Sequence, residues 1–255
     1  MSPRPTPRQL EGKIRECLQD FYRRRLSMLE GLRLKKILRR KNPYLFRALG
    51  NEVTADIVKQ ILQAYVSSSD ETIFGDAFFE PLALMASVGK VSDAAGVDLV
   101  IERPKRYTAV ALKSGPNIFN ASQKRRQNQE FNELRSRLYK IHKQFDPLLG
   151  HAYGRRNTEP SGKWIYRERS GQAFWREITS DPDFYLKLVR LMKDIPSKHK
   201  KRQAEEWGAA VNRFTVEFAK DFCSENGRID WEKLVEFVSK DEGSRSNKQA
   251  AKPKS

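Results

Sequence analysis

The chain has 255 residues, of which 38% are hydrophobic and 32% are charged, and its net charge is +17. This length allows one large domain, or one domain with a small helical appendage. The charge favours a polyanionic partner, because each phosphate that a basic side chain neutralises releases counterions. Nucleic acid is preferred to a membrane, since the chain lacks the apolar run of about 18 residues that a spanning helix needs.

The sequence has neither the cysteine and histidine spacing of a zinc site nor a glycine-rich phosphate-binding loop. The two cysteines, Cys17 and Cys223, are far apart, and the three histidines, His142, His151 and His199, have no ligand spacing. A structural zinc site and a disulfide framework are therefore not expected. The lack of a glycine-rich phosphate loop argues against a nucleotide-driven enzyme.

The first forty residues are expected to form a basic helical arm. Residues 1–8 lack the apolar stretch of a secretory signal, so a cytoplasmic location is expected. From Gln9 to Arg40, apolar residues recur at helical spacing. Pro43 ends this pattern because proline lacks an amide hydrogen and disfavours a helical residue before it.

Two further helices are expected before the first strand. One begins at Thr54, a suitable N-cap, and runs to Tyr65. A turn is expected at Ser67–Asp70, and the next helix runs from there toward Ala86. Pro81 lies inside this helix and should kink or split it.

The centre of the chain predicts a β-hairpin. Two β-rich runs, Val97–Glu102 and Tyr107–Lys113, flank a polar turn. Asp98 at the start of one strand and Lys113 at the end of the other can meet at one edge of a sheet. The carboxylate would hold a divalent metal, and the ammonium would stabilise charge on a phosphate. The alternative is a surface hairpin whose Asp98 and Lys113 are solvated strand ends.

Downstream segments extend this hairpin into a larger α/β fold. A long helix with a basic face follows the hairpin, and residues 149–155 and 163–169 are expected to add strands to a sheet of at least four. The expected organisation is a basic helical arm at 1–40, a catalytic domain at 41–196, a helical C-terminal extension at 197–240 and a disordered tail at 241–255.

The hairpin and its surroundings resemble the core of the PD-(D/E)XK nucleases, and in particular a group of type II restriction endonucleases. Six motifs that match this group occur in the expected order: residues 41–46, 67–75, 96–98, 113–117, 153–155 and 171–175. The resemblance implies a mixed central sheet of about four strands flanked by helices, with helical N- and C-terminal extensions. It also implies Mg²⁺ as the cofactor.

The resemblance implies that Asp98 and an acid from the preceding helix bind the metal, with Lys113 as the catalytic cation. Glu80 is preferred as the helix acid, because an idle charge beside Phe78, Phe79 and Leu82 would be costly to bury. Glu71 stays as the alternative. Its position in the expected first helical turn gives it a structural role, since an acid there suits the helix dipole.

One position departs from the PD-(D/E)XK pattern. Two residues before the lysine, where such nucleases carry Asp or Glu, stands Ala111. In some restriction enzymes the following helix supplies the missing acid, which makes Glu130 and Glu133 candidates here, and Gln123 could bind a water or serve as a weak ligand. Asn117 is a further candidate.

The leading hypothesis is Mg²⁺-dependent, site-specific hydrolysis of double-stranded DNA. Cutting two strands with one active site per chain implies a twofold homodimer. A cognate DNA methyltransferase would protect the host genome. Two rival hypotheses remain: a non-catalytic DNA-binding relative with a degraded metal site, and a repair nuclease that reads DNA structure.

Overall fold

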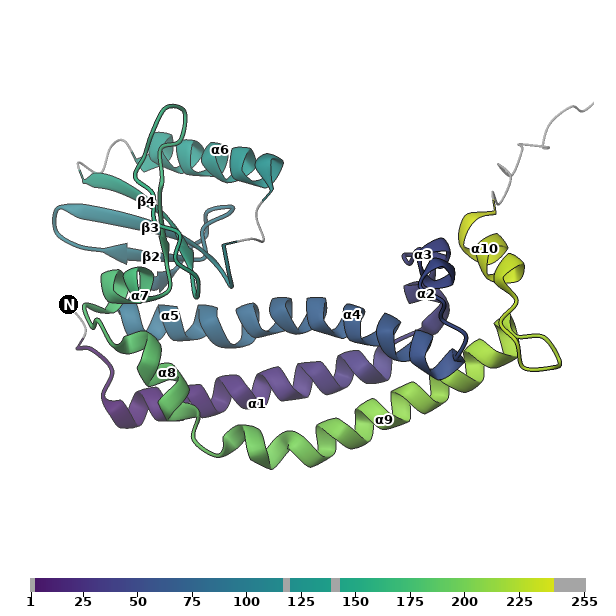
Figure 1. Ribbon diagram of the computed structural model, residues 1–255. Coiled ribbons are helices and arrows are strands. Elements are labelled where there is room, and N and C mark those ends of the chain that lie inside the picture. The colour runs from purple at the N-terminus through teal and green to yellow at the C-terminus, as the bar shows by residue number, and fades with distance from the viewer. Residues whose placement is uncertain (1–2, 117–119, 139–142, 241–255) are drawn as a thin grey trace, which may run out of the picture. The chain divides into compact units, whose positions relative to one another are not determined.

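The chain divides into two compact units. The computed structural model describes residues 3–116, 120–138 and 143–240 (Figure 1). The first unit, here called the sheet unit, comprises Met1–Ser27 and Ser68–Ala204, and the second, the helical unit, comprises Met28–Ser67 and Glu205–Ser255. The boundaries between the units fall within three long helices: α1 (Pro7–Gly31), α4 (Thr54–Phe74) and α9 (Ile195–Phe222).

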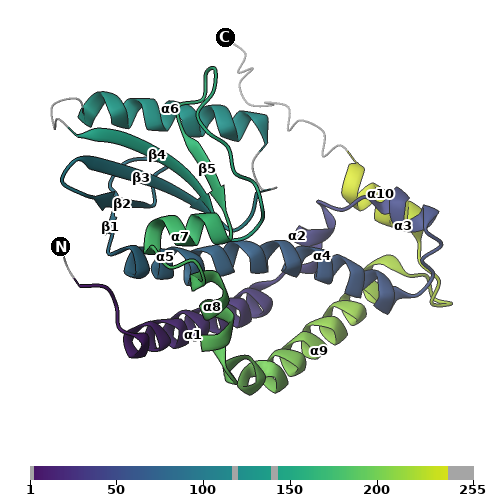
Figure 2. The same ribbon diagram turned by 60° about the vertical axis from the view of Figure 1, so that its left-hand side comes forward.

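The sheet unit contains a mixed five-stranded sheet with the strands in chain order (Figure 2). The first three strands are antiparallel neighbours, and the third, fourth and fifth are parallel. The strands are β1 (Lys90–Val91), β2 (Leu99–Glu102), β3 (Arg106–Lys113), β4 (Gln144–His151) and β5 (Arg167–Ser170). The predicted hairpin is confirmed as β2 and β3, with Leu99 opposite Val110.

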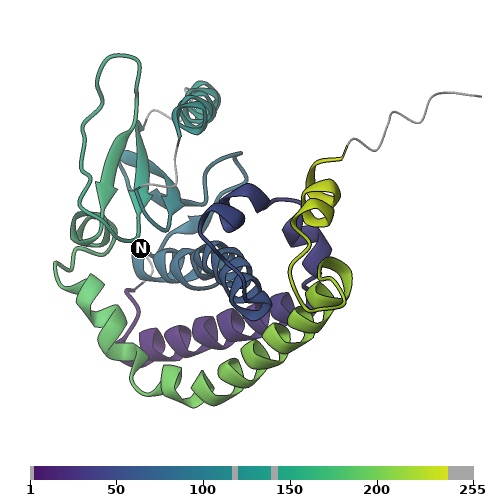
Figure 3. The same ribbon diagram turned by 45° about the vertical axis from the view of Figure 1, so that its right-hand side comes forward.

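Helices cover both faces of this sheet. On one face lies α6 (Ala121–Arg137), which Figure 3 shows nearly end-on. Its Phe131 packs with Ala109 and Ala111 of β3 in one apolar cluster. Val110 and Leu112 point to the opposite face, as strand alternation predicts. That face packs against α1 and four shorter elements: η1 (Gly75–Phe79), α5 (Glu80–Ser87), α7 (Gln172–Thr179) and α8 (Phe184–Met192).

The turn predicted at Ser67–Asp70 is wrong. Helix α4 runs through it, and its hydroxyl-bearing residues lie on solvent-facing or half-buried positions while Val66 and Ala77 on either side are buried. Serine disfavours a helix interior only weakly, so burial of the flanking apolar residues decides the local structure. The irregularity expected from Pro81 is present as the π-helix η1, which leads directly into α5.

The last two strands also differ from expectation. Residues 149–155 and 163–169 were expected as strands around a turn, but the observed strands β4 and β5 are parallel. Strand β4 begins at Gln144, and Asp146 near its start is buried among charged partners. Its pairing with β3 along all eight residues makes β3 an interior strand of the sheet.

The helical unit has its own apolar core. It adds α2 (Leu34–Leu38), α3 (Pro43–Ala48) and α10 (Trp231–Ser239) to its parts of the long helices. Ile57, Ile61 and Phe218 are fully buried in this core. In the part of the chain that the structure describes, no helix combines the length and apolarity needed to cross a membrane.

Candidate active site

A cleft of about 470 Å³, lined by both charged and apolar side chains, lies at the carboxyl end of β3. One wall is the end of the strand, and the other is the helical run from α4 through η1 to α5. Three acids and one lysine are among the residues that line it, which are Ser68, Glu71, Thr72, Gly75, Asp76, Phe79, Glu80, Leu112, Lys113, Ser114 and Tyr153. The cleft therefore brings together charged groups from two elements that are far apart in the sequence.

Asp98 and Lys113 meet at the adjoining edge of the hairpin. Asp98 Oδ2 lies 3.8 Å from Lys113 Nζ and accepts a hydrogen bond of 2.6 Å from the amide of Leu112. Both side chains are about a quarter to a third exposed, at 26% and 30%. Asp98 is not among the described residues that line the cleft, and it adjoins the cleft through Lys113. The hydrogen bond fixes one carboxylate oxygen beside the lysine that faces the cleft.

Glu80 carries the clearest electrostatic signature in the cleft. Burial raises its pKa from 4.5 to about 7, and the nearby negative charges of Asp98 and Asp76 add to the rise, whereas Lys113 opposes it. Glu80 is thus close enough to Asp98 and Lys113 for their charges to be felt. A carboxylate whose pKa is raised by burial and by neighbouring negative charge is typical of functional sites, because a bound cation relieves the repulsion.

Asp76 was not singled out from the sequence, although it lies in the same cleft. It stands four residues before Glu80, a spacing that puts two side chains on one face of a helix. That spacing is the signal which could have identified it. Asp76 also lies within the π-turn of η1. The extra residue in such a turn changes the direction of the side chains that follow, and π-turns are frequent at functional sites.

Glu71 lies in the cleft for a different reason from the one expected. The first-turn position assumed for it is wrong, because α4 begins at Thr54 and Glu71 is in its last turn. The helix dipole therefore gives it no structural role. Its carboxylate accepts a 3.4 Å hydrogen bond from the Tyr153 hydroxyl, and its carbonyl accepts one of 3.2 Å from Ser114 Oγ.

The helical run approaches β3 closely at Gly75. A Cβ added there would lie 2.8 Å from Ser114 Oγ, the hydroxyl that binds the Glu71 carbonyl. Glycine at this position lets the wall that carries the acids pack against the end of the strand that carries Lys113.

The other predicted candidates have different partners. Gln123 forms a capping box with Asn120 at the start of α6, and Glu130 pairs with Arg126 at 2.9 Å. Among the described residues, neither lines the cleft. Asn117 lies outside the described residues. Glu133 accepts a hydrogen bond from Gln129 on the exposed face of α6. Ala111 is fully buried against α6.

Comparison with protein families identifies the chain. The model of the type II restriction endonuclease EcoO109I family matches residues 8–202, which is most of the chain and includes the cleft and the hairpin. The chain belongs to this family. The restriction endonuclease is accordingly a site-specific deoxyribonuclease, a hydrolase of DNA. No curated protein matches it.

The oxygen ligands that the restriction endonuclease offers suit an open Mg²⁺ site better than a metal centre formed entirely by protein side chains. Within residues 3–116, 120–138 and 143–240, no group of three or more His, Cys, Asp or Glu side chains forms such a centre. Mg²⁺ is commonly held by one or two carboxylates, with water and substrate phosphate completing the octahedron. Glu80, which lines the cleft, and Asp98, which adjoins it, would be donors of this kind.

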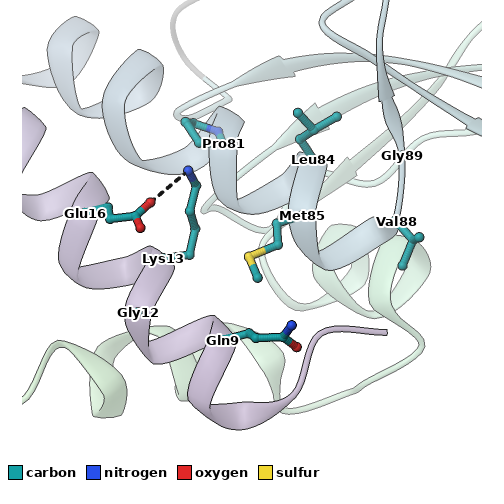
Figure 4. Close-up of a pocket in the computed structure, with 9 residues that line it drawn as sticks. All are labelled: Gln9, Gly12, Lys13, Glu16, Pro81, Leu84, Met85, Val88 and Gly89. Carbon is teal, nitrogen blue, oxygen red and sulfur yellow. Dashed lines mark hydrogen bonds and ion pairs between the residues drawn. The ribbon is translucent and has the colours of Figure 1, made fainter. Parts of the chain in front are cut away.

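A second cleft, of about 690 Å³, provides a contrast. It lies between α1 and α5 (Figure 4), and its α5 side is largely apolar, with Pro81, Leu84 and Met85. The acid that lines it, Glu16, is paired with Lys13 at 3.2 Å. The larger cleft thus lacks the clustered carboxylates of the smaller one, although it is more spacious.

Proposed function

We propose that the restriction endonuclease cleaves both strands of DNA with Mg²⁺ at the cleft beside the β2–β3 hairpin. The observation that best supports this proposal is the pairing of Asp98 with Lys113 close to Glu80. The pKa of Glu80 is raised to about 7, mainly by burial and in part by the charge of Asp98. An Asp–Lys pair alone is a common surface feature of little energetic value. The half-buried carboxylate beside it is what supports a catalytic role.

Each residue has a distinct role in the proposed reaction. Asp98 and Glu80 would hold the cation, which when bound would polarise the phosphate and lower the pKa of a water. Lys113 stabilises negative charge on the pentavalent phosphate or orients the attacking water. The amide of Leu112 fixes the Asp98 carboxylate, so that this group is held in place before the substrate arrives.

With these residue roles, we propose that the sheet unit belongs to the PD-(D/E)XK class. Asp98 and Lys113 stand on neighbouring antiparallel strands, which supports it. Ala111, buried against α6, takes the place of the usual acid. The helical run lines the cleft with carboxylates beside Lys113, so that Glu80, with Asp76 four residues before it, would offset the missing group. The catalytic interval 41–196 predicted from the sequence contains all of these residues.

The assembly and the genetic partner are also proposals. Cleavage of both strands from one site per chain requires two chains related by a twofold axis, matching a palindromic or near-palindromic target. A restriction endonuclease of this kind needs a cognate DNA methyltransferase, since otherwise the host's own sites would be cut.

Digestion of a mixed plasmid and phage DNA panel tests the proposal. We expect discrete fragments with Mg²⁺ and no cleavage after addition of a chelator. Mapping of the fragment ends would give the recognition sequence. Discrete cleavage that persists in chelator would contradict the metal requirement, and smeared products would contradict site specificity.

A further inference from the structure

The helical unit presents apolar side chains to solvent within a strongly basic segment. On α3 and just after it, four large apolar side chains are more than half exposed: Tyr44 at 64%, Leu45 at 53%, Leu49 at 64% and Val53 at 56%. Scattered exposed apolar residues need no explanation, but four within ten residues form a concentration that does.

The backbone that carries these side chains is held in place. Pro43 is buried, and Phe46 packs against the core of the helical unit. The Asn42 side chain accepts a hydrogen bond of 3.2 Å from the Leu45 amide, and the Arg47 guanidinium lies 5.6 Å from the centre of the Trp231 ring. Tyr44 and Leu45 therefore project from a fixed helix, which is how a binding group is best presented.

Charge identifies the partner. Residues 31–51 contain no Asp or Glu. They contain seven basic residues, namely Arg33, Lys35, Lys36, Arg39, Arg40, Lys41 and Arg47. Lys35 pairs with Asp221 and Arg47 with Glu52, both acids outside the segment. Such a surface complements a polyanion and not a neutral protein face.

Other occupants fit less well. A second copy of the chain placed on this face would bring two strongly basic segments together, and like charges in contact are unfavourable. The C-terminal residues 241–255 contain no large apolar side chain and more Lys and Arg than Asp and Glu, so their composition does not suit the face either. The substrate of the family, DNA, offers both phosphates and apolar base and sugar surfaces.

We propose that the segment 39–53 is a DNA-contacting surface, in which Arg40 and Lys41 bind phosphates and Tyr44 and Leu45 pack against bases or sugars in a groove. Proteins that insert apolar side chains between basic anchors into a groove commonly deform the duplex there. The proposal rests on the DNA substrate of the family and not on the metal site, because it concerns binding without cleavage.

Binding in chelator separates this surface from the cleavage site. We would measure fluorescence anisotropy of a labelled 40-base-pair duplex with the full-length protein and EDTA, over a range of salt concentrations. Arg40→Ala with Lys41→Ala should weaken binding to all sequences and reduce the slope of log affinity against log salt by about one for each phosphate that is no longer neutralised. Tyr44→Ala and Leu45→Ser should weaken affinity about fivefold or more with the slope unchanged, because stacking and apolar packing release no counterions.

Matched controls lie in the same unit. Val216 is 71% exposed on α9, and Lys59 is exposed on α4, so Val216→Ser and Lys59→Ala should leave affinity near the parental value. Circular dichroism and light scattering would report folding and molar mass for every variant. Parental affinity in Tyr44→Ala and Leu45→Ser would overturn the proposal. A changed molar mass with parental affinity would also overturn it and would assign the face to an interface between chains.

Discussion

Asp98 Oδ2 lies 3.8 Å from Lys113 Nζ while it accepts a 2.6 Å hydrogen bond from the amide of the residue just before that lysine. The two contacts tie the beginning of one strand to the end of its neighbour. In the proposed reaction they present one anionic and one cationic group at a single edge of the sheet. Substituting each side chain in turn can therefore test the role of the anion and the role of the cation separately.

Asp98→Asn should slow cleavage strongly while preserving DNA binding. The amide keeps the size of the side chain but removes the charge that attracts Mg²⁺, and loss of one such group costs about 10²–10³ in rate. Lys113→Ala should lose a similar factor. Single-turnover cleavage in Mg²⁺ and affinity in Ca²⁺ would be measured side by side. Asp93→Asn, at an exposed acid outside the cleft, is the control. A folded Asp98→Asn protein that cuts at the parental rate would show that the hairpin is not the active site.

Glu80 and Glu71 line the same cleft but should differ in importance. The charges that act on Glu80 include those of Asp98 and Lys113, whereas the carboxylate of Glu71 binds the hydroxyl of Tyr153. Glu80→Gln should therefore lower the cleavage rate by about 10²–10³, and Glu71→Gln should leave it within a few-fold. Rates at saturating Mg²⁺ decide the assignment. The reverse order of effects would transfer the role of metal ligand to Glu71.

The stability of the metal-free protein should depend on the ionisation of Glu80. Its pKa is 4.5 in an ordinary setting and about 7 in the folded protein, so between these values the folded state retains a proton that the unfolded chain has lost. The free energy of unfolding therefore falls as the pH rises through this window. In EDTA at pH 8, Glu80→Gln should be more stable than the parent by about 1–2 kcal/mol, once solvent screening of this half-buried group is taken into account, and at pH 4 the two should be equal.

Thermal unfolding in EDTA and in Mg²⁺ would check this expectation. The cation should stabilise the parent at pH 8, because it relieves the repulsion among the carboxylates, and it should stabilise Glu80→Gln much less. If the two proteins respond equally to Mg²⁺, the cation does not bind at Glu80.

The hairpin could be predicted from sequence because its signals are local. Alternation, a polar turn and Pro116 after the second strand define β2 and β3 without reference to the rest of the chain. The parallel partners β4 and β5 could not be predicted as well, since their pairing depends on contacts between distant segments. Phe145, for example, fits a helical apolar stripe in the sequence but lies in β4.

The candidate site could be predicted only in part. The strand positions indicate that Asp98 and Lys113 can meet, the family resemblance implies their roles, and its apolar neighbours favour Glu80 as the helix acid. The positions of Asp76 and Glu71 depend on two features that the sequence conceals, a helix that continues through serines and a π-turn. Burial of Val66 and Ala77 favours the continuous helix, and the π-turn directly precedes the helical turn that contains Pro81.

Asp146 should matter for folding and not for cleavage. It is 6% exposed near the start of β4, accepts hydrogen bonds from Thr108 and Arg167, and lies at the end of the parallel strands away from Lys113. Asp146→Ala would leave the half-buried guanidinium of Arg167 with fewer acceptors, so the free energy of unfolding should fall by about 3–5 kcal/mol. Urea denaturation measures this loss. Glu133→Ala, on an exposed face, should change it by less than about 0.5 kcal/mol. An unchanged urea midpoint for Asp146→Ala would contradict the expectation.

Asp76 should act on Glu80 through its charge. Asp76 is exposed in the cleft, and its negative charge is one of the causes that raise the pKa of Glu80. Asp76→Asn removes that charge, so the pKa of Glu80 should fall and the carboxylate should stay ionised to lower pH. At a fixed Mg²⁺ concentration below saturation, the acidic limb of the cleavage profile should move to lower pH by less than about one unit. The concentration of Mg²⁺ that gives half the maximal rate at pH 8 should rise, because the less negative cleft attracts the cation more weakly.

Glu71→Gln is the matched control, since the charge of Glu71 is not among the causes of the shift at Glu80. It should leave the acidic limb in place. A limb that stays at the parental pH in Asp76→Asn, or moves to higher pH, would show that Asp76 does not tune Glu80.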